Sequence, residues 1–182
     1  GSVEPGHSVF IAGAGPVGLL VLLAVKTLGV KQVYMSDLSP SRLNKALELG
    51  ATGVFNPTDI KIPAAIREVT GGRGVDVSIE AVGIEATLKD CLASTAFGGT
   101  VIIQGIFTER AQVHMLGFVT KEMTMIGANS INAGRALEWL TTRDIRPESI
   151  VTSVVPLDNI VADGFEALAN HREGEIKMLI QP

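Results

Sequence analysis

A glycine-rich turn near the start of the chain constrains its fold more than any other feature. The run Gly13-Ala14-Gly15-Pro16-Val17-Gly18 has the spacing GxGxxG, which alone is weak because glycines are common in turns. Its flanks make it specific, because an apolar run at residues 8–12 precedes it and an apolar helical pattern begins at Pro16. A strand, this turn and a helix, in that order, are the fingerprint of dinucleotide binding. We therefore predict that the turn holds the pyrophosphate of a dinucleotide.

Each glycine of the turn has its own physical role. Gly13 permits the tight turn, Gly15 lets the backbone approach the pyrophosphate, and Gly18 allows the helix to pack closely on the strand. The free N–H groups and the dipole at the helix N-terminus favour a bound anion there. The alternative is an ordinary strand–helix turn without a ligand, which the flanking strand and helix make the weaker interpretation.

An acidic residue follows at the distance that the fingerprint requires. Asp37 lies nineteen residues after Gly18, directly behind a predicted strand at residues 32–36. A carboxylate there accepts hydrogen bonds from the adenosine ribose and repels the extra 2′-phosphate of NADP. We therefore predict NAD as the cofactor, the alternative being a turn aspartate beside the helix cap Ser39. The nearby Arg42 could cover the adenine ring, pair with Asp37 or remain solvated.

Short β-rich runs alternate with helical patterns along most of the chain, which indicates a parallel sheet covered by helices. We predict an α/β fold, a doubly wound, parallel, six-stranded Rossmann sheet with helices on both faces. The predicted strands are residues 8–12, 32–36, 53–55, 75–81, 100–104 and 123–127, and the predicted helices are residues 16–29, 40–50, 60–70, 84–96, 133–142 and 159–171. Residues 98–99 are expected to form a turn, and residues 111–115, 151–155 and 177–180 to be extended. We assign residues 1–182 to one NAD-binding domain, with residues 1–2 as the remnant of a cleaved tag.

Composition excludes several classes of function. A chain of 182 residues, 46% of them hydrophobic, suffices for one core, and its net charge of -4 disfavours nucleic acid or an acidic membrane as a partner. Residues 8–25 carry no charge, but internal glycines argue against a membrane span. Cys91 is the only cysteine, which favours a reducing cytoplasm and a packing role. With only His7, His114 and His171 beside it, we predict neither a metal site nor a catalytic residue in this chain.

Four segments together resemble the cofactor-binding half of the medium-chain dehydrogenases. They are residues 12–18, 36–43, 49–51 and 74–83. The similarity extends over residues 9–182, and it is greatest to the zinc-type polyol (sorbitol), butanediol and threonine dehydrogenases. The zinc-free quinone reductases of the same superfamily usually have a turn richer in glycine and alanine and lack the aspartate. The resemblance therefore implies the zinc-type subfamily.

The resemblance implies contacts along the whole cofactor. Residues 16–18 would lie along the pyrophosphate, and Asp37 and Arg42 would hold the adenosine. Residues 81–83 would border the adenine. Gly105 and Ile106 would flank the nicotinamide, and residues 128–130 would lie near it. The predicted cofactor-binding residues are Gly13, Gly15, Pro16, Val17, Gly18, Asp37, Arg42, Ala81, Val82, Gly105, Ile106 and Ala128. Polyol dehydrogenases often have an arginine at about the position of Ser130, and this chain lacks that contact.

The resemblance also implies that the other half of such an enzyme lies outside this sequence. In these enzymes a mostly β, GroES-like domain precedes the cofactor domain and supplies the ligands of a catalytic zinc. We expect zinc only in that domain, where it would polarise a small secondary alcohol for hydride transfer to NAD. We expect the isolated chain to be inactive. We also expect a homo-oligomer through an edge strand that begins with Ala111 and ends with Met115.

Two other classes of function remain as alternatives. A stand-alone, non-catalytic NAD-binding sensor would need only these residues, whereas clustered Cys and His residues upstream would favour the dehydrogenase. A methyltransferase also has a glycine-rich turn after its first strand, but Ile11-Ala12 lacks the acidic residue usual there, and the third glycine favours a dinucleotide. Glu80 lies at the carboxyl end of the predicted fourth strand, the edge where ligands gather, and the sequence assigns it no role.

Overall fold

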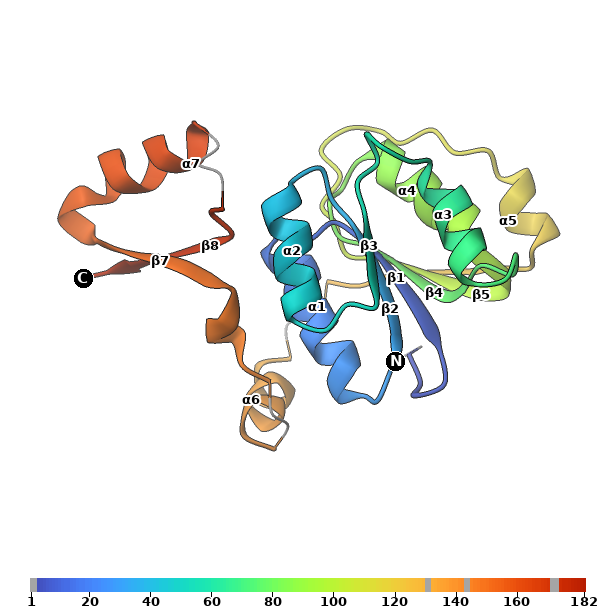
Figure 1. Ribbon diagram of the computed structural model, residues 1–182, viewed down its shortest axis with the longest axis horizontal. Helices are drawn as coiled ribbons and strands as arrows, with labels where there is room; N and C mark the ends of the chain where they lie inside the picture. Colours follow the sequence, from blue (N-terminus) through green and yellow to red (C-terminus); the bar gives the residue numbers. More distant parts are fainter. Residues whose placement is uncertain (1–2, 130–131, 143–144, 171–173) are drawn as a thin grey trace.

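The larger part of the chain forms a parallel sheet of six strands in the order β3-β2-β1-β4-β5-β6. The structure is a computed structural model that describes residues 3–129, 132–142, 145–170 and 174–182 (Figure 1). The strands are β1 (Ser8–Ala12), β2 (Gln32–Ser36), β3 (Gly53–Phe55), β4 (Val75–Glu80), β5 (Thr95–Ile103) and β6 (Thr124–Gly127). The helices that accompany them are α1 (Pro16–Thr27), α2 (Pro40–Glu48), α3 (Ile62–Val69), α4 (Glu85–Ser94), α5 (Leu116–Thr120) and α6 (Ala133–Thr142). The predicted doubly wound α/β fold is confirmed.

The two faces of the sheet have separate cores because successive side chains of a strand point to opposite sides. In β1, Val9 and Ile11 belong to the core under α1 and α2, whereas Phe10 belongs to the core under α3 and α4. Every residue of β1 is buried. Because β1 is a central strand covered on both faces, it is apolar from Val9 to Ala12 and begins with the buried polar Ser8.

The parallel pairing brings the ends of all six strands together at one edge of the sheet, where Phe55, the last residue of β3, pairs with Ser36. The chain runs from β1 out to β3 and then returns to β4 beside β1, so the order reverses between β1 and β4. The register pairs Ala12 with Ser36 and with Glu80, Glu80 with Ile103, and Ile103 with Gly127. We call this row of strand ends the carboxyl edge. In open α/β sheets, ligands bind in the crevice outside this edge, where the strand order reverses.

The predicted helix boundaries at α1 and α2 are close to those observed. Pro16 is the first residue of α1, and Gly29 follows the helix with a φ of 86°. Pro40 begins α2, and the Ser39 side chain accepts a hydrogen bond from the Arg42 backbone. Proline at a first turn and a left-handed glycine after a helix end are the usual boundary residues.

The predicted turn at residues 98–99 was wrong. Gly98 and Gly99 lie inside β5, whose pairing with β4 shifts register between Val75 and Val77. A Cβ atom at Gly99 would lie 2.9 Å from the Asp76 carbonyl oxygen. These glycines therefore mark an irregularity in a continuous strand, which is the other common use of glycine in a sheet.

The predicted edge strand at residues 111–115 was also wrong. This segment forms no strand, and helix α5, which the sequence did not predict, follows it directly. Ala111 and Val113 pack against the core under α3 and α4, and the Gln112 backbone donates to the Glu85 carboxylate. The alternating pattern thus reflects packing on one side of a loop, and β6 is one of the two outer strands of the sheet, β3 being the other.

The last part of the chain forms a second, two-stranded sheet beside the first. Strands β7 (Val151–Pro156) and β8 (Lys177–Gln181) pair in parallel, and they lie to the left in Figure 1. A 3₁₀ turn (Pro147–Ile150) precedes β7, and the connection to β8 contains a 3₁₀ turn (Leu157–Asn159), a π-helix (Ile160–Glu166) and α7 (Ala167–Ala169). The single helix predicted at residues 159–171 is therefore interrupted; its predicted end at His171, like residues 1–2, lies outside the described residues.

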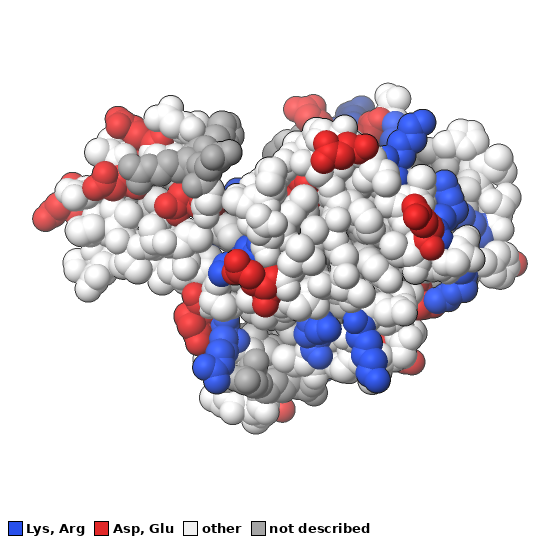
Figure 2. Space-filling model, in the orientation of Figure 1, with Lys and Arg blue, Asp and Glu red and all other residues white. Residues whose placement is uncertain are grey.

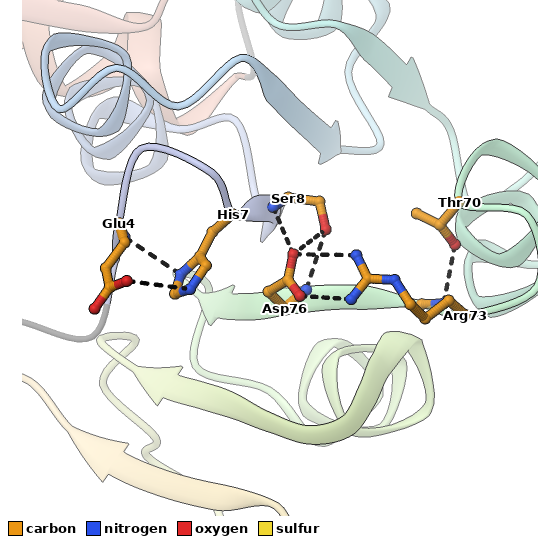
Figure 3. A network of polar contacts seen from close by, with 7 residues as sticks. Glu4, His7, Ser8, Thr70, Arg73 and Asp76 are labelled. Carbon is orange, nitrogen blue, oxygen red and sulfur yellow. Dashed lines mark hydrogen bonds and ion pairs between the residues drawn. The ribbon is translucent and has the colours of Figure 1, made fainter.

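A polar network joins the amino-terminal ends of β1 and β4, opposite the carboxyl edge (Figure 3). The Asp76 carboxylate accepts hydrogen bonds from the Ser8 backbone N–H at 2.8 Å, from Ser8 Oγ at 2.7 Å and from Arg73 Nη1 at 2.6 Å. The Arg73 guanidinium, with the Ser8 donors, holds the pKa of the Asp76 carboxyl well below its usual range. The network therefore favours the folded state while Asp76 is ionised.

We predict that Asp76→Asn lowers the free energy of unfolding at pH 7 by about 1–2 kcal/mol, the scale of hydrogen bonds to a charged group at a partly exposed site. Because the pKa is lower in the folded state, this stabilisation is complete above the unfolded pKa of about 3.9 and is lost as pH falls. Urea unfolding at pH 7 and pH 3 measures it, with the exposed Asp158→Asn as control. An equal loss at both pH values would contradict the charge-based account.

Candidate functional site

A cavity of about 660 Å³ opens at the carboxyl edge. The body of the molecule and its C-terminal segment both contribute to its wall, and the space-filling view shows a notch between these two parts (Figure 2). The lining residues are Gly13, Ser36, Asp37, Leu38, Ser39, Pro40, Arg42, Pro57, Val82, Ile84, Ala86, Thr87, Asp90, Leu168, Gly174 and Glu175. Ligand cavities of this size are usually apolar with a few convergent polar groups, and this lining fits that description.

The glycine-rich turn brings the start of α1 close to the end of β1. A Cβ atom at Gly18 would overlap the carbonyl group of Gly13, which itself has a φ of 103°. Gly15 is the N-cap of α1, where no side chain caps the helix and no acidic residue occupies the first turn. The N-terminus of α1 is therefore open to an anion, as expected for a pyrophosphate site.

Asp37 connects the glycine-rich turn to the start of α2. Its Oδ2 accepts from the Ala14 backbone N–H at 2.8 Å, and its Oδ1 accepts from the Ser39 backbone N–H at 2.9 Å. Each carboxylate oxygen has a further lone pair, so Asp37 keeps the capacity to accept from ribose hydroxyls. Sequence reasoning missed this double role, because the spacing of the fingerprint does not show which backbone groups face the carboxylate.

Arg42 lies over the glycine-rich turn. Its Nη1 would be 4.0 Å from a Cβ atom at Gly15, and no ion pair joins it to Asp37, both residues being described. Of the three arrangements left open by the sequence, pairing with Asp37 is therefore excluded in this structure. The guanidinium instead adds positive charge beside the open end of α1.

The structure gives a role to Glu80, the buried last residue of β4. Its Oε1 accepts from the backbone N–H groups of Val82 at 3.0 Å and Gly83 at 2.9 Å, and from Thr87 Oγ1 at 2.7 Å. Its backbone carbonyl accepts from the N–H group of Gly105 at 3.0 Å. One residue thus fixes the loops that follow β4 and β5, and both loops were predicted to border the cofactor.

The structure brings four of the predicted site residues into one cavity: Gly13, Asp37, Arg42 and Val82. Val82 lies against the glycine-rich turn, since a Cβ atom at Gly13 would be 2.6 Å from its Cγ2. The other predicted residues do not line this cavity: Gly15, Pro16, Val17, Gly18, Ala81, Gly105, Ile106 and Ala128. They follow the ends of β1, β4, β5 and β6 at the same edge, and Ser130 lies outside the described residues.

Several lining residues were not predicted from the sequence. Thr87 and Asp90 are three residues apart on α4, and Glu175 comes from the segment before β8. Burial raises the pKa of the half-buried Asp90 carboxyl. Helical periodicity in the predicted helix 84–96 could have paired Thr87 with Asp90, but no sequence signal places Glu175 near Asp37.

The residues that the structure describes do not fit a catalytic zinc. Across the described ranges, no three His, Cys, Asp or Glu side chains gather in a group able to hold a metal ion. Cys91 is fully buried, and burial, with a smaller effect of the Glu80 charge, raises the pKa of its thiol. Cys91 is thus a packing residue under α4. In the described part of the chain, every helix is too short or too polar to cross a membrane.

Comparison with known proteins gives a consistent family assignment. Residues 16–142 match the family described as zinc-binding dehydrogenase. The chain is 34% identical to (R,R)-butanediol dehydrogenase of Bacillus subtilis, over 99% of this chain and 52% of that protein. It is 31% identical to sorbitol dehydrogenase of Bos taurus, over 98% of this chain and 51% of that enzyme.

Solved structures agree with the sequence comparison. The crystal structure of the Bacillus subtilis 2R,3R-butanediol dehydrogenase superposes with a TM-score of 0.89 at 33% identity, covering 99% of this chain and 52% of that chain. A protein from Sinorhizobium meliloti classed as a zinc-binding dehydrogenase, solved bound to NADP, superposes with a TM-score of 0.87 at 28% identity, covering 99% of this chain and 54% of that one. The chain spans about half the length of the relatives it matches. It therefore belongs to the zinc-binding dehydrogenase family, of which it contains the Rossmann-fold half.

Proposed function

We propose that this chain is the NAD-binding half of a zinc-dependent alcohol or polyol dehydrogenase. The observation that supports this most strongly is the position of Asp37, which lies at the end of β2 and faces one cavity together with the glycine-rich turn. The open N-terminus of α1 and the absence of side-chain bulk at Gly13 and Gly15 fit a pyrophosphate. These features are present in this chain without any contribution from another domain.

Each part of the cofactor has a candidate partner in this chain. The start of α1 would hold the pyrophosphate, with Gly15, Pro16, Val17 and Gly18 along it, and Asp37 would accept from the adenosine ribose. Ala81 and Val82 would border the adenine, and Gly105, Ile106 and Ala128 would lie at the nicotinamide. NAD, when bound, supplies the acceptor of a hydride. The role of this chain is to bind that acceptor and to orient it at the carboxyl edge of the sheet.

We further infer that the site prefers NAD over NADP. Asp37 is already held by two backbone N–H groups, so its carboxylate cannot turn away from a 2′-phosphate without losing them. Asp90 and Glu175 add negative charge to the same cavity, and Arg42 is the one cation among the lining residues that the structure describes. A structurally similar protein, that of Sinorhizobium meliloti, was solved bound to NADP, so the preference for NAD has to be measured on this chain itself.

The remaining functions belong to a parent protein. We propose that a second domain holds the zinc and binds a small secondary alcohol, because the relatives are about twice as long as this chain and are named for such substrates. We also propose a cytoplasmic homo-oligomer. The outer strand β6, rather than residues 111–115, is the candidate edge for pairing with a second copy.

We predict that the purified chain binds NAD in a calorimetric titration but does not form NADH from 2,3-butanediol or sorbitol, with or without added zinc. Binding needs only the carboxyl edge, whereas oxidation needs a metal site, which the described residues do not form, and substrate groups that we assign to the second domain. Alcohol-dependent NADH formation that a chelator abolishes would contradict this division. Absence of NAD binding would overturn the proposed function itself.

Replacing Asp37 tests cofactor choice. We predict that Asp37→Ala weakens NAD binding by about 10- to 150-fold, the equivalent of 1.5 to 3 kcal/mol for hydrogen bonds to a charged group. NADP should bind better, because its 2′-phosphate no longer meets a carboxylate and Arg42 stays available. Asp37→Asn keeps a side chain of the same shape, and the exposed Asp59→Ala controls for loss of charge. Equal weakening of NAD and NADP would mean that Asp37 only holds the turn.

A further inference from the structure

We propose that Asp90 is a specificity residue that recognises the amino edge of the cofactor's adenine. The proposal rests on the proposed NAD site and concerns which base that site accepts. It assigns to the Asp90 carboxylate a hydrogen bond from the exocyclic 6-amino group of adenine. A base with a carbonyl group at that position would be disfavoured.

Helix α4 places Asp90 at the wall of the cavity. Residues three apart on a helix share a face, and Thr87 and Asp90 both line the cavity that contains Asp37. Thr87 is held in place, because its hydroxyl donates to Glu80 Oε1 at 2.7 Å and to the Ile84 carbonyl at 2.9 Å. The face of α4 that presents Asp90 is thus tied to the buried end of β4.

Asp90 differs from the other acids of the cavity, because the described residues give its side chain no hydrogen-bond or ion-pair partner. Asp37 accepts from the Ala14 and Ser39 backbone N–H groups, and Glu175 accepts from the hydroxyls of Thr152 and Ser153. For Asp90, no hydrogen bond or ion pair is found with any residue in the described ranges, although its side chain is half-buried. A partly desolvated carboxylate without a donor gains most from a ligand that brings one.

The walls beside Asp90 suit a flat aromatic base. Leu38, Pro57, Val82 and Ile84 line the cavity, and Leu38 and Ile84 are 66% and 49% exposed. Apolar side chains left open in this way can cover the faces of a purine, which leaves its polar edge to α4. Adenine carries an amino donor at position 6, whereas hypoxanthine and guanine carry a carbonyl acceptor there. A carboxylate accepts from the amino group and repels the carbonyl oxygen.

The test compares NAD with nicotinamide hypoxanthine dinucleotide, whose base carries a carbonyl in place of the 6-amino group and a proton on the neighbouring N1. Both are titrated by calorimetry into the wild-type chain, Asp90→Asn and Asp90→Ala. We expect the wild type to bind NAD at least about tenfold more tightly, the effect of one hydrogen bond to a charged group. Asp90→Asn offers both a donor and an acceptor, so it should bring the two dissociation constants to within about threefold of each other.

A matched control removes a charge outside the cavity. Glu68→Gln on α3 is exposed and does not line the cavity, so it should leave the ratio of the two dissociation constants unchanged. Thermal melting of each variant shows that it is folded. If the wild type binds NAD but the ratio is the same in all variants, Asp90 does not read the base and the proposal is wrong. If the wild type binds neither dinucleotide, the proposed NAD site fails instead.

Discussion

The contact between the start of α1 and the end of β1 governs the geometry of this molecule. Gly18 lies so close to the Gly13 carbonyl that no side chain fits between them. Helix α1 can therefore lie flat on the sheet, where Leu19 and Leu22 are fully buried against β1 and β2. The same approach directs the open N-terminus of α1 at the carboxyl edge. Both the packing of α1 and the binding of an anion thus depend on the close contact between the backbones of Gly18 and Gly13, which only glycine permits.

The carboxylates of Asp37 and Glu80, together with the Glu80 backbone carbonyl, hold the loops of the carboxyl edge in place before any ligand arrives. Asp37 links the glycine-rich turn to α2, and Glu80 links the loops after β4 and β5. Loops fixed in this way lose little entropy when a ligand binds, which favours affinity. The described residues give Glu80 Oε2 no hydrogen-bond partner, and a Cβ atom at Gly105 would overlap it. The loop after β5 therefore requires glycine at this position for steric reasons as well.

The fold was largely predictable from the sequence because its apolar runs are short and clearly bounded. Strands β1 to β3 have the predicted limits, since turn residues or a helix cap flank each run. The turn predicted at Gly98 and Gly99 was wrong because glycine occurs in bulges as well as in turns. The strand predicted at residues 111–115 was wrong because a loop that packs on one side has the same alternation of apolar and polar residues as a strand. At the site, Gly13, Asp37 and Val82 followed from motif and resemblance. Asp90 and Glu175 did not, because they come from a helix and a C-terminal segment that meet Asp37 only in three dimensions.

The central claim is that the carboxyl edge of this sheet binds NAD through the glycine-rich turn and Asp37. A ¹H–¹⁵N NMR titration of the labelled chain with NAD tests it most directly, because it locates the ligand residue by residue. The account predicts that the backbone amides of Ala14, Val17, Gly18 and Ser39 shift on binding. The amides of Ser8 and Asp76, at the opposite end of the sheet, should not shift. Shifts concentrated at that opposite end or on the β7–β8 sheet, with none in the glycine-rich turn, would contradict the account.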